Sequence, residues 1–161
     1  MNPLPIDPRE KVCRHIDAIF GAGVSEALYV ADLQFNFSKR TGRIKNISIG
    51  GRLAVTLRTD GGLALTIAGA QYLLENGKQF RENCIEPMEE AVPFVSESRS
   101  LFCKHVKWCG SNIKVGSDVA IIDGNNKVVA VGIAVLSSGL MAQYRKGVAV
   151  KVRQGIKGRA E

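Results

Sequence analysis

The feature that most restricts the fold of this chain is an almost unbroken apolar run from Val128 to Leu136, VVAVGIAVL. A strand that faces water on one side alternates apolar and polar residues, and this run contains no polar side chain. Such a strand is buried on both faces, as it would be inside a barrel or between two layers. Gly132, in the middle of the run, predicts a bulge or a sharp bend.

Shorter elements surround this run in the second half of the chain. A strand over residues 118–123 precedes it, and a short helix after Ser137 or Ser138 and a closing strand follow it. In the closing strand, Lys151 and Arg153 should point to the face opposite the neighbouring valines, because side chains alternate along a strand. The short helix is expected to bury three side chains: Leu140, Met141 and Tyr144.

The first half of the chain predicts a layer of helices on an antiparallel sheet. Asp7 can cap a helix that begins at Pro8, and apolar residues then recur at helical spacing. A second short helix should cover residues 68–75. Strand patterns lie between the two helices, in four segments: 33–38, 47–49, 52–58 and 63–67. The alternation in the last two, joined by Asp60-Gly-Gly, is typical of a hairpin with one buried face.

A segment rich in glutamate and proline, residues 86–93, separates these two halves. We therefore predict an α+β chain with a small N-terminal domain over residues 1–88 and a mostly β domain over residues 89–155. Residues 156–161 are basic and glycine-rich, and we expect them to form a flexible tail.

Positive charge is concentrated in the second half. Residues 1–90 contain 11 Lys and Arg against 11 Asp and Glu, whereas residues 91–161 contain 11 against 4, so the whole net charge of +7 lies after residue 90. Such an asymmetry favours a polyanionic partner for the second half, nucleic acid above all. A basic surface that only keeps the protein soluble is the alternative.

The second half resembles a PUA domain. The resemblance rests on three segments in order: residues 112–123, 128–137 and 146–153. They carry a glycine-aspartate entry to one strand, an Ala-Val-Gly-x-Ala strand, and a closing Gly-x-Ala-Val-x-Val strand. Gly116-Ser117-Asp118-Val119 departs by one residue from the commonest entry. The resemblance implies a mixed β pseudo-barrel that binds RNA.

Parts of the chain upstream are similar to the region before the PUA domain in archaeal tRNA-guanine transglycosylases and related archaeosine proteins. The matching segments are residues 20–28, 38–44, 65–70, 91–95 and 102–106. In those enzymes the resemblance implies a PUA domain that grips the acceptor end of tRNA while a catalytic barrel exchanges a base. Such a barrel needs about 250 residues, so these 161 residues cannot contain it. The binding role is expected to carry over, and the catalytic role is not.

RNA binding needs cations that meet phosphates and flat side chains that stack on exposed bases. The second half offers both in two regions, and PUA domains are expected to place these regions side by side. The candidate RNA-binding residues are Lys104, His105, Lys107, Trp108, Lys114, Arg145, Lys146, Lys151 and Arg153.

Each candidate also has a structural alternative. A single tryptophan or histidine is often a core residue, the lysines are also typical of solvated surface, and cations at 145–146 complement a helix dipole. In the first half, Lys39, Arg40, Arg43 and Lys45 surround a Thr-Gly turn. They are compatible with a second RNA contact or with a solvated loop.

The sequence shows no sign of catalysis or of a cofactor. It lacks GxSxG, P-loop and HExxH motifs, and no two of its four cysteines have the CxxC spacing of a metal site. We therefore expect no enzyme activity, no cofactor and no metal. No long apolar run or signal-peptide pattern is present, which predicts a cytoplasmic protein without membrane contact.

Three hypotheses for function follow. The first is an RNA-binding accessory of tRNA modification, with tRNA as its partner and a tRNA-modifying catalytic subunit beside it. The second is a ribosome-biogenesis factor that binds rRNA, since another family also places a small α/β domain before a PUA domain. The third is a protein–protein adaptor that docks to an RNA-modifying enzyme through its neutral N-terminal sheet.

Overall fold

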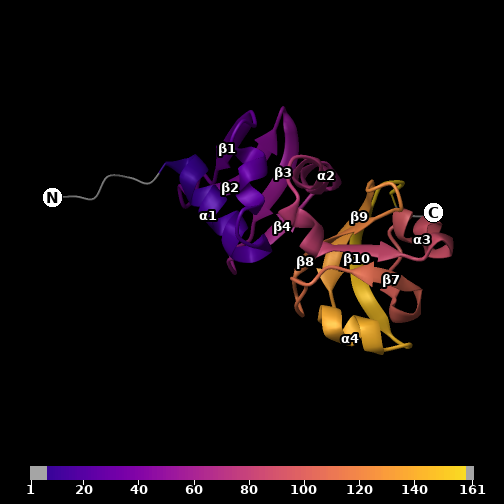
Figure 1. Ribbon diagram of the computed structural model, residues 1–161. Helices are drawn as coiled ribbons and strands as arrows, with labels where there is room; N and C mark the ends of the chain where they lie inside the picture. The colour runs from indigo at the N-terminus through magenta and orange to yellow at the C-terminus, as the bar shows by residue number, and fades with distance from the viewer. Residues whose placement is uncertain (1–6, 159–161) are drawn as a thin grey trace.

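The computed structural model describes residues 7–158, and its first half consists of helices and an antiparallel sheet (Figure 1). The sheet has the strand order β1-β2-β3-β4. In chain order the elements are α1 (Pro8–Phe20), the 3-10 helix η1 (Val24–Leu28), β1 (Leu33–Phe37), β2 (Ile44–Ile49), β3 (Arg52–Leu57), β4 (Leu63–Leu65), α2 (Ile67–Glu75) and the 3-10 helix η2 (Gln79–Asn83).

The second half is built around a curled sheet of six strands in the order β6-β10-β9-β8-β5-β7. Most pairs are antiparallel, but β5 and β8 are parallel, so the sheet is mixed. Its elements are β5 (Cys84–Pro87), the 3-10 helix η3 (Glu89–Ala91), α3 (Val92–Ser96), β6 (Leu101–Phe102), the 3-10 helix η4 (Cys103–His105), β7 (Val106–Cys109), β8 (Asp118–Ile122), β9 (Val128–Ala134), α4 (Ser138–Gln143) and β10 (Val148–Gly155). The predicted α+β class, with a mixed β half-barrel after an antiparallel layer, is confirmed.

The first helix begins where its sequence predicts. Asp7 is the cap and accepts a hydrogen bond from the Arg9 backbone N–H at 3.0 Å, and Pro8 is the first helical residue. The Glu10 carboxylate pairs with Arg14 one turn along the helix. Of the predicted apolar stripe Val12, Ile16, Ile19 and Phe20, α1 buries all but Ile19, which is 38% exposed.

The expected burial of the second hairpin is only partly correct. We expected Leu53, Val55 and Leu57 to share one buried face, yet the Leu53 side chain is 44% exposed and Ala54 is buried. The cause is a bulge: Ile47 of β2 lies opposite Val55, and the next residue, Ser48, lies opposite Leu53. The bulge turns Ala54 toward α2. The helix lies so close to β3 there that a Cβ added to Gly69 would lie only 2.2 Å from the Ala54 carbonyl oxygen.

The second sheet begins earlier than the domain boundary that we placed at residue 88. β5, over Cys84–Pro87, lies between β8 and β7 of that sheet, so the structure favours a boundary near residue 83. At the other end, Ile156 and Lys157 donate backbone hydrogen bonds to Val129 and Ser96. The expected tail is thus tied to the domain as far as residue 158, and its residues 159–161 lie outside the described part.

The two halves share a hydrophobic core. One cluster joins α1 and the first sheet to Ala120, Ile122, Val128 and Val131 on β8 and β9. A second cluster fills the half-barrel itself, between β8, β9, β10 and α3. β9 is therefore buried on both faces, as its unbroken apolar sequence predicts, and the two domains are not independent bodies on a linker.

A buried ion pair joins the two sheets at this junction. Asp118, at the start of β8, is 5% exposed, and its Oδ2 accepts a hydrogen bond from the Leu65 backbone N–H of β4 at 2.7 Å. Arg153 donates from Nη1 to Asp118 Oδ1 at 2.7 Å and from Nη2 to the Leu65 carbonyl oxygen at 2.6 Å. Both backbone groups of Leu65 are thus satisfied by side chains of the other sheet, where an edge strand would otherwise leave them open.

A β-bulge turns Arg153 toward this junction. Val152 lies opposite Gly132 and Gln154 opposite Val131, so Arg153 is the extra residue on β10. Gly132 permits the close approach, because a Cβ there would lie 2.3 Å from the Lys151 carbonyl oxygen. The expectation that Lys151 and Arg153 share an outward face is therefore corrected. The bulge that we expected at Gly132 lies instead on the neighbouring strand β10, opposite this glycine.

The junction predicts a measurable loss of stability. Asp118→Ala should lower the free energy of unfolding by about 3 kcal/mol, because it leaves the Arg153 guanidinium and the Leu65 N–H without their acceptor. Urea unfolding followed by circular dichroism measures the change. Asp118→Ala combined with Arg153→Met should cost less than the sum of the two single changes, since the pair is coupled.

Asp32→Ala serves as the control, because Asp32 is exposed and its loss should cost less than about 0.5 kcal/mol. If Asp118→Ala unfolds at the urea concentration of the control, the ion pair does not hold the sheets together.

Candidate nucleic-acid interface

Three of the seven predicted RNA-binding cations meet around a pocket at the α4 end of the half-barrel. The pocket has a volume of about 330 Å³ and is lined by Lys104, Lys107, Trp108 and Arg145, four of the nine predicted residues. η4 and β7 supply the first three, and the segment after α4 supplies Arg145. Two stretches some 40 residues apart in sequence are thereby brought together, as the resemblance implied.

The floor of this pocket, which we call the α4 pocket, is apolar. Val106, Cys109 and Met141, which are buried or half-buried, contribute to it. Desolvation raises the pKa values of the Cys103 and Cys109 thiols that line it, so both stay neutral at pH 7. The charge of the pocket is therefore that of its lysines and arginine, and its thiols are not activated nucleophiles.

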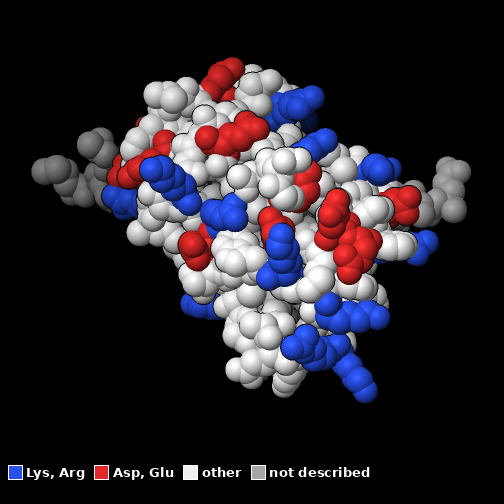
Figure 2. Space-filling model, turned by 45° about the vertical axis from the view of Figure 1, so that its right-hand side comes forward, with Lys and Arg blue, Asp and Glu red and all other residues white. Residues whose placement is uncertain are grey.

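The cations around the α4 pocket are not equally available. Lys107 Nζ lies 3.5 Å from Glu86 Oε2, an ion pair at the surface that weakens the attraction of this lysine for an anion. Lys104 and Arg145 are exposed, and neither lies within 4 Å of a carboxylate in the part of the chain that is described. In Figure 2 the lower end of the molecule, where α4 lies, carries basic side chains with no acidic ones among them.

The remaining predicted residues lie outside the lining of this pocket. Lys146 is exposed beside Arg145, and Lys114 and Lys151 are exposed elsewhere on the surface. His105 is half-buried, and its carbonyl oxygen accepts a hydrogen bond from the Met88 backbone N–H. Arg153 is occupied by Asp118 and Leu65, so we no longer include it among the RNA-binding candidates.

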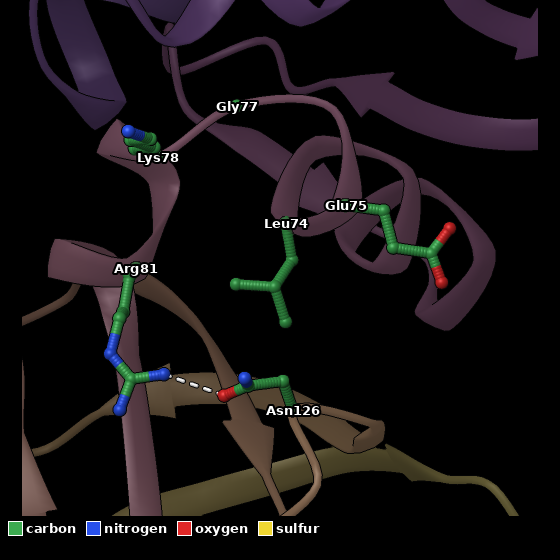
Figure 3. A pocket seen from close by; sticks show the side chains of 6 residues that line it. All are labelled: Leu74, Glu75, Gly77, Lys78, Arg81 and Asn126. Atoms are coloured by element: carbon green, nitrogen blue, oxygen red, sulfur yellow. Dashed lines mark hydrogen bonds between the residues drawn. The ribbon is translucent and has the colours of Figure 1, made fainter.

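Trp108 is neither a fully buried core residue nor a fully exposed ring that could stack on a base. It is half-buried and packs against the shared core, and the guanidinium of Arg81 lies 4.6 Å from its ring centroid. Figure 3 shows Arg81 from η2 directed toward Asn126, to whose side-chain oxygen it donates at 2.6 Å. The ring is thus fixed by a cation–π contact while it borders the α4 pocket.

Tyr144 is a functional candidate that the sequence reasoning missed. We expected Leu140, Met141 and Tyr144 to be buried, but only Met141 is, and Tyr144 is 50% exposed on the rim of the α4 pocket. The helix ends at Gln143, and Tyr144 has extended backbone angles (φ −81°, ψ 140°). Its side chain is therefore not on the inner face of α4 and is free to stack on a base.

Within residues 7–158 no cluster of three or more His, Cys, Asp or Glu side chains is arranged to bind a metal ion. None of the helices in this range has the length and apolar character needed to cross a bilayer.

Two family profiles match adjoining parts of the chain. The PUA domain matches residues 85–156, and the patch-forming domain C2 of tRNA-guanine transglycosylase matches residues 11–79. The two ranges meet near residue 83, where the second sheet begins.

Curated relatives extend this similarity over nearly the whole chain. The chain is 31% identical over 150 residues to the tRNA-guanine(15) transglycosylase of Methanothermobacter thermautotrophicus, covering 93% of this chain and 23% of that protein. It is 34% identical over 140 residues to the corresponding protein of Thermoplasma acidophilum, covering 86% of this chain and 22% of that protein. The chain thus spans less than a quarter of the length of these relatives.

Solved structures share the fold at lower identity. A protein of Pyrococcus horikoshii superimposes with a TM-score of 0.71 at 18% identity, covering 96% of this chain and 93% of that one. A conserved PUA domain protein of Thermoplasma acidophilum gives a TM-score of 0.66 at 18% identity, covering 92% and 91%. The arrangement of the two sheets is therefore one that known structures also adopt.

The contact between Arg81 and Trp108 predicts a spectroscopic change. Trp108 is the only tryptophan of the chain, so the fluorescence reports on this ring alone. Arg81→Ala should uncover the ring, shift its emission to longer wavelength and increase its quenching by acrylamide, while stability falls by about 1 kcal/mol.

Arg14→Ala is the control, because Arg14 pairs with Glu10 on α1, away from Trp108. Identical quenching in wild type, Arg81→Ala and Arg14→Ala would contradict the cation–π contact.

Proposed function

We propose that this chain is a non-catalytic RNA-binding protein that recognises the acceptor end of tRNA. The premise is that the chain has a PUA domain and is homologous to the C-terminal part of archaeal tRNA-guanine transglycosylase. The observation that carries the proposal is the α4 pocket, in which exposed cations surround an apolar floor with an aromatic side chain at its rim.

The chemistry of the α4 pocket suits the end of an RNA strand. Lys104 and Arg145 lie on its rim and can meet phosphates, and Tyr144 and the apolar floor can receive a base. A volume of about 330 Å³ is at the small end of the range for ligand pockets, which favours one or two nucleotides over a duplex groove. The unpaired 3′ end of tRNA has this form, because its bases are not held by complementary pairing.

The relatives give the biological setting of the proposal. They are named as transglycosylases that act on guanine in tRNA, and this chain corresponds to their C-terminal part. We propose that it serves as an accessory of tRNA modification in the cytoplasm, holding the acceptor end while a catalytic subunit modifies the base.

Reversal of the two pocket cations tests the proposal. Lys104→Glu with Arg145→Glu should weaken binding to unmodified tRNA at least about tenfold, because two phosphate contacts become repulsive. The slope of log affinity against log salt should fall by about 1.4 to 1.8. Fluorescence anisotropy with labelled tRNA across a salt series measures both quantities.

The 3′ CCA end gives a second test. Wild type should bind tRNA that lacks this end more weakly than intact tRNA, and Tyr144→Ala should reduce this difference.

Lys127→Glu with Lys157→Glu changes the net charge by the same amount at exposed lysines outside the α4 pocket. If both double variants lose the same tRNA affinity, the protein binds tRNA by general charge attraction and not through the α4 pocket. Wild type that binds intact and truncated tRNA equally would argue against acceptor-end recognition and turn attention to rRNA.

A further inference from the structure

The first half of the chain is electrically neutral by composition, yet its charges are sorted in space. A groove of about 1040 Å³, three times the volume of the α4 pocket, runs between α1, the β1–β2 hairpin and the β3–β4 turn. Its lining contains six cationic side chains and no carboxylate: Lys11, Lys39, Arg40, Arg43, Lys45 and Arg58. We call this surface the hairpin groove.

These cations have few partners within the protein. Arg58 lies 3.8 Å from Asp118, but the other five have no Asp or Glu within 4 Å in residues 7–158. All five are exposed. Like charges held this close repel one another, so an arrangement without internal counter-ions favours an external polyanion.

Backbone hydrogen bonds and strand register fix the path of the segments that carry these cations. In the turn between β1 and β2, Ser38 donates a backbone hydrogen bond to the Arg43 carbonyl at 2.7 Å, and Gly42 donates one to the Ser38 carbonyl at 2.8 Å. Asn36 lies opposite Asn46 and Phe37 opposite Ile44, so Lys45 is the extra residue of a bulge. On the other side, His15 of α1 bonds through Nε2 to the Gly61 carbonyl oxygen at 2.7 Å, which ties the helix to the β3–β4 turn.

Phe37 adds an aromatic surface that the core does not use. The preceding apolar residues of β1, Leu33 and Phe35, pack against the shared core, whereas Phe37 is 51% exposed and lines the hairpin groove. An exposed phenylalanine among cations is the combination with which proteins hold single-stranded nucleic acid, because every base has a face that can stack.

We propose that the hairpin groove is a second RNA site, which holds a single-stranded segment with its phosphates on the cations and an unpaired base stacked on Phe37. The site goes beyond the proposed function, because it lies on the other domain and needs no contact with the α4 pocket. Figure 1 places the β1–β2 hairpin and α4 at opposite ends of the molecule. One RNA that fills both sites must therefore extend along the whole protein.

The composition of the groove favours RNA over a lipid surface. The turn that carries three of the six cations, Ser38–Arg43, contains no large apolar side chain that could insert between acyl chains. A volume of about 1040 Å³ is at the upper limit for pockets that hold small ligands, about 300–1,000 Å³, which suits several nucleotides in a row.

The test uses the full chain and two fluorescein-labelled RNA probes, a twelve-nucleotide oligo(U) strand and a tRNA acceptor-stem minihelix. Lys39→Glu with Arg43→Glu should weaken oligo(U) binding at least about tenfold and lower its salt slope by about 1.4, the value for two contacts to a single strand. Minihelix affinity should change by less than about twofold. Lys104→Glu with Arg145→Glu should give the reverse pattern, so failure of one site is distinguishable from failure of the other.

Phe37 separates stacking from charge attraction. Phe37→Leu should weaken oligo(U) binding by about fivefold, the equivalent of about 1 kcal/mol of lost stacking, with the salt slope unchanged, and Phe37→Trp should restore it. Heparin, a polyanion without bases, should bind equally well to wild type and to Phe37→Leu.

Arg52→Glu with Lys78→Glu is the matched control, since both residues are exposed cations of the first half outside the groove lining. Thermal unfolding by circular dichroism checks that each variant is folded. Equal loss of oligo(U) affinity in the control and the groove variant, or unchanged oligo(U) binding in Phe37→Leu, would overturn the proposal and leave a general polyanion surface. Unchanged oligo(U) binding in a folded groove variant would overturn it outright.

Discussion

The structure depends on the way in which Asp118 and Arg153 hold the backbone of Leu65. An edge strand normally leaves its outer N–H and C=O groups to solvent or to another chain. Here the carboxylate and the guanidinium of the half-barrel satisfy both groups at 2.6–2.7 Å. The shared core then closes around the junction, because β8 and β9 lie directly behind it. The two domains thus present their outer surfaces in a fixed relation, which gives each candidate site a defined position.

Some arginines of this chain make contacts within the protein, whereas others line the two basic surfaces together with lysines. Arg9, Arg81 and Arg153 donate to acceptors within the protein, to backbone carbonyls, an amide oxygen and a carboxylate. A planar guanidinium can satisfy several acceptors at once, which makes arginine suitable for such junctions. The lysines lie mostly on the surface, where they remain available to phosphates. Net charge therefore overstates the number of cations that can bind a phosphate. The number of Lys and Arg side chains without a partner inside the protein is the better measure.

The two basic surfaces differ in form, and this difference bears on function. The α4 pocket is small, apolar at its floor and rimmed by Lys104 and Arg145, which suits the end of a strand. The hairpin groove is larger and is lined by six cations rather than three, which suits several phosphates in succession. A protein with both sites can orient a folded RNA rather than merely attract it, because contacts at two ends of a rigid body fix direction as well as position.

The sequence alone determined the elements that depend on local pattern. Three features follow from periodicity and turn chemistry: the burial of β9 on both faces, the cap at Asp7, and the division into a helical layer with its antiparallel sheet and a mixed β domain. The resemblance to a PUA domain also identified the two stretches that meet at the α4 pocket. Charge counting correctly assigned the net excess to the second half.

Only the tertiary structure decided which side chains are free to bind. Arg153 is taken up by a carboxylate 35 residues away, a contact that neither strand periodicity nor charge can reveal. Tyr144 becomes exposed because α4 ends at Gln143, before it reaches this residue, and helix ends are set by packing as much as by propensity. In the first half, the sequence grouped Lys39, Arg40, Arg43 and Lys45 around a turn but left open whether they bind RNA or only face solvent. The fold adds two further cations to this cluster, from α1 and from the β3–β4 turn, and leaves no carboxylate in the lining of the groove. Such facts depend on contacts between residues distant in sequence, and those contacts exist only once the chain has folded.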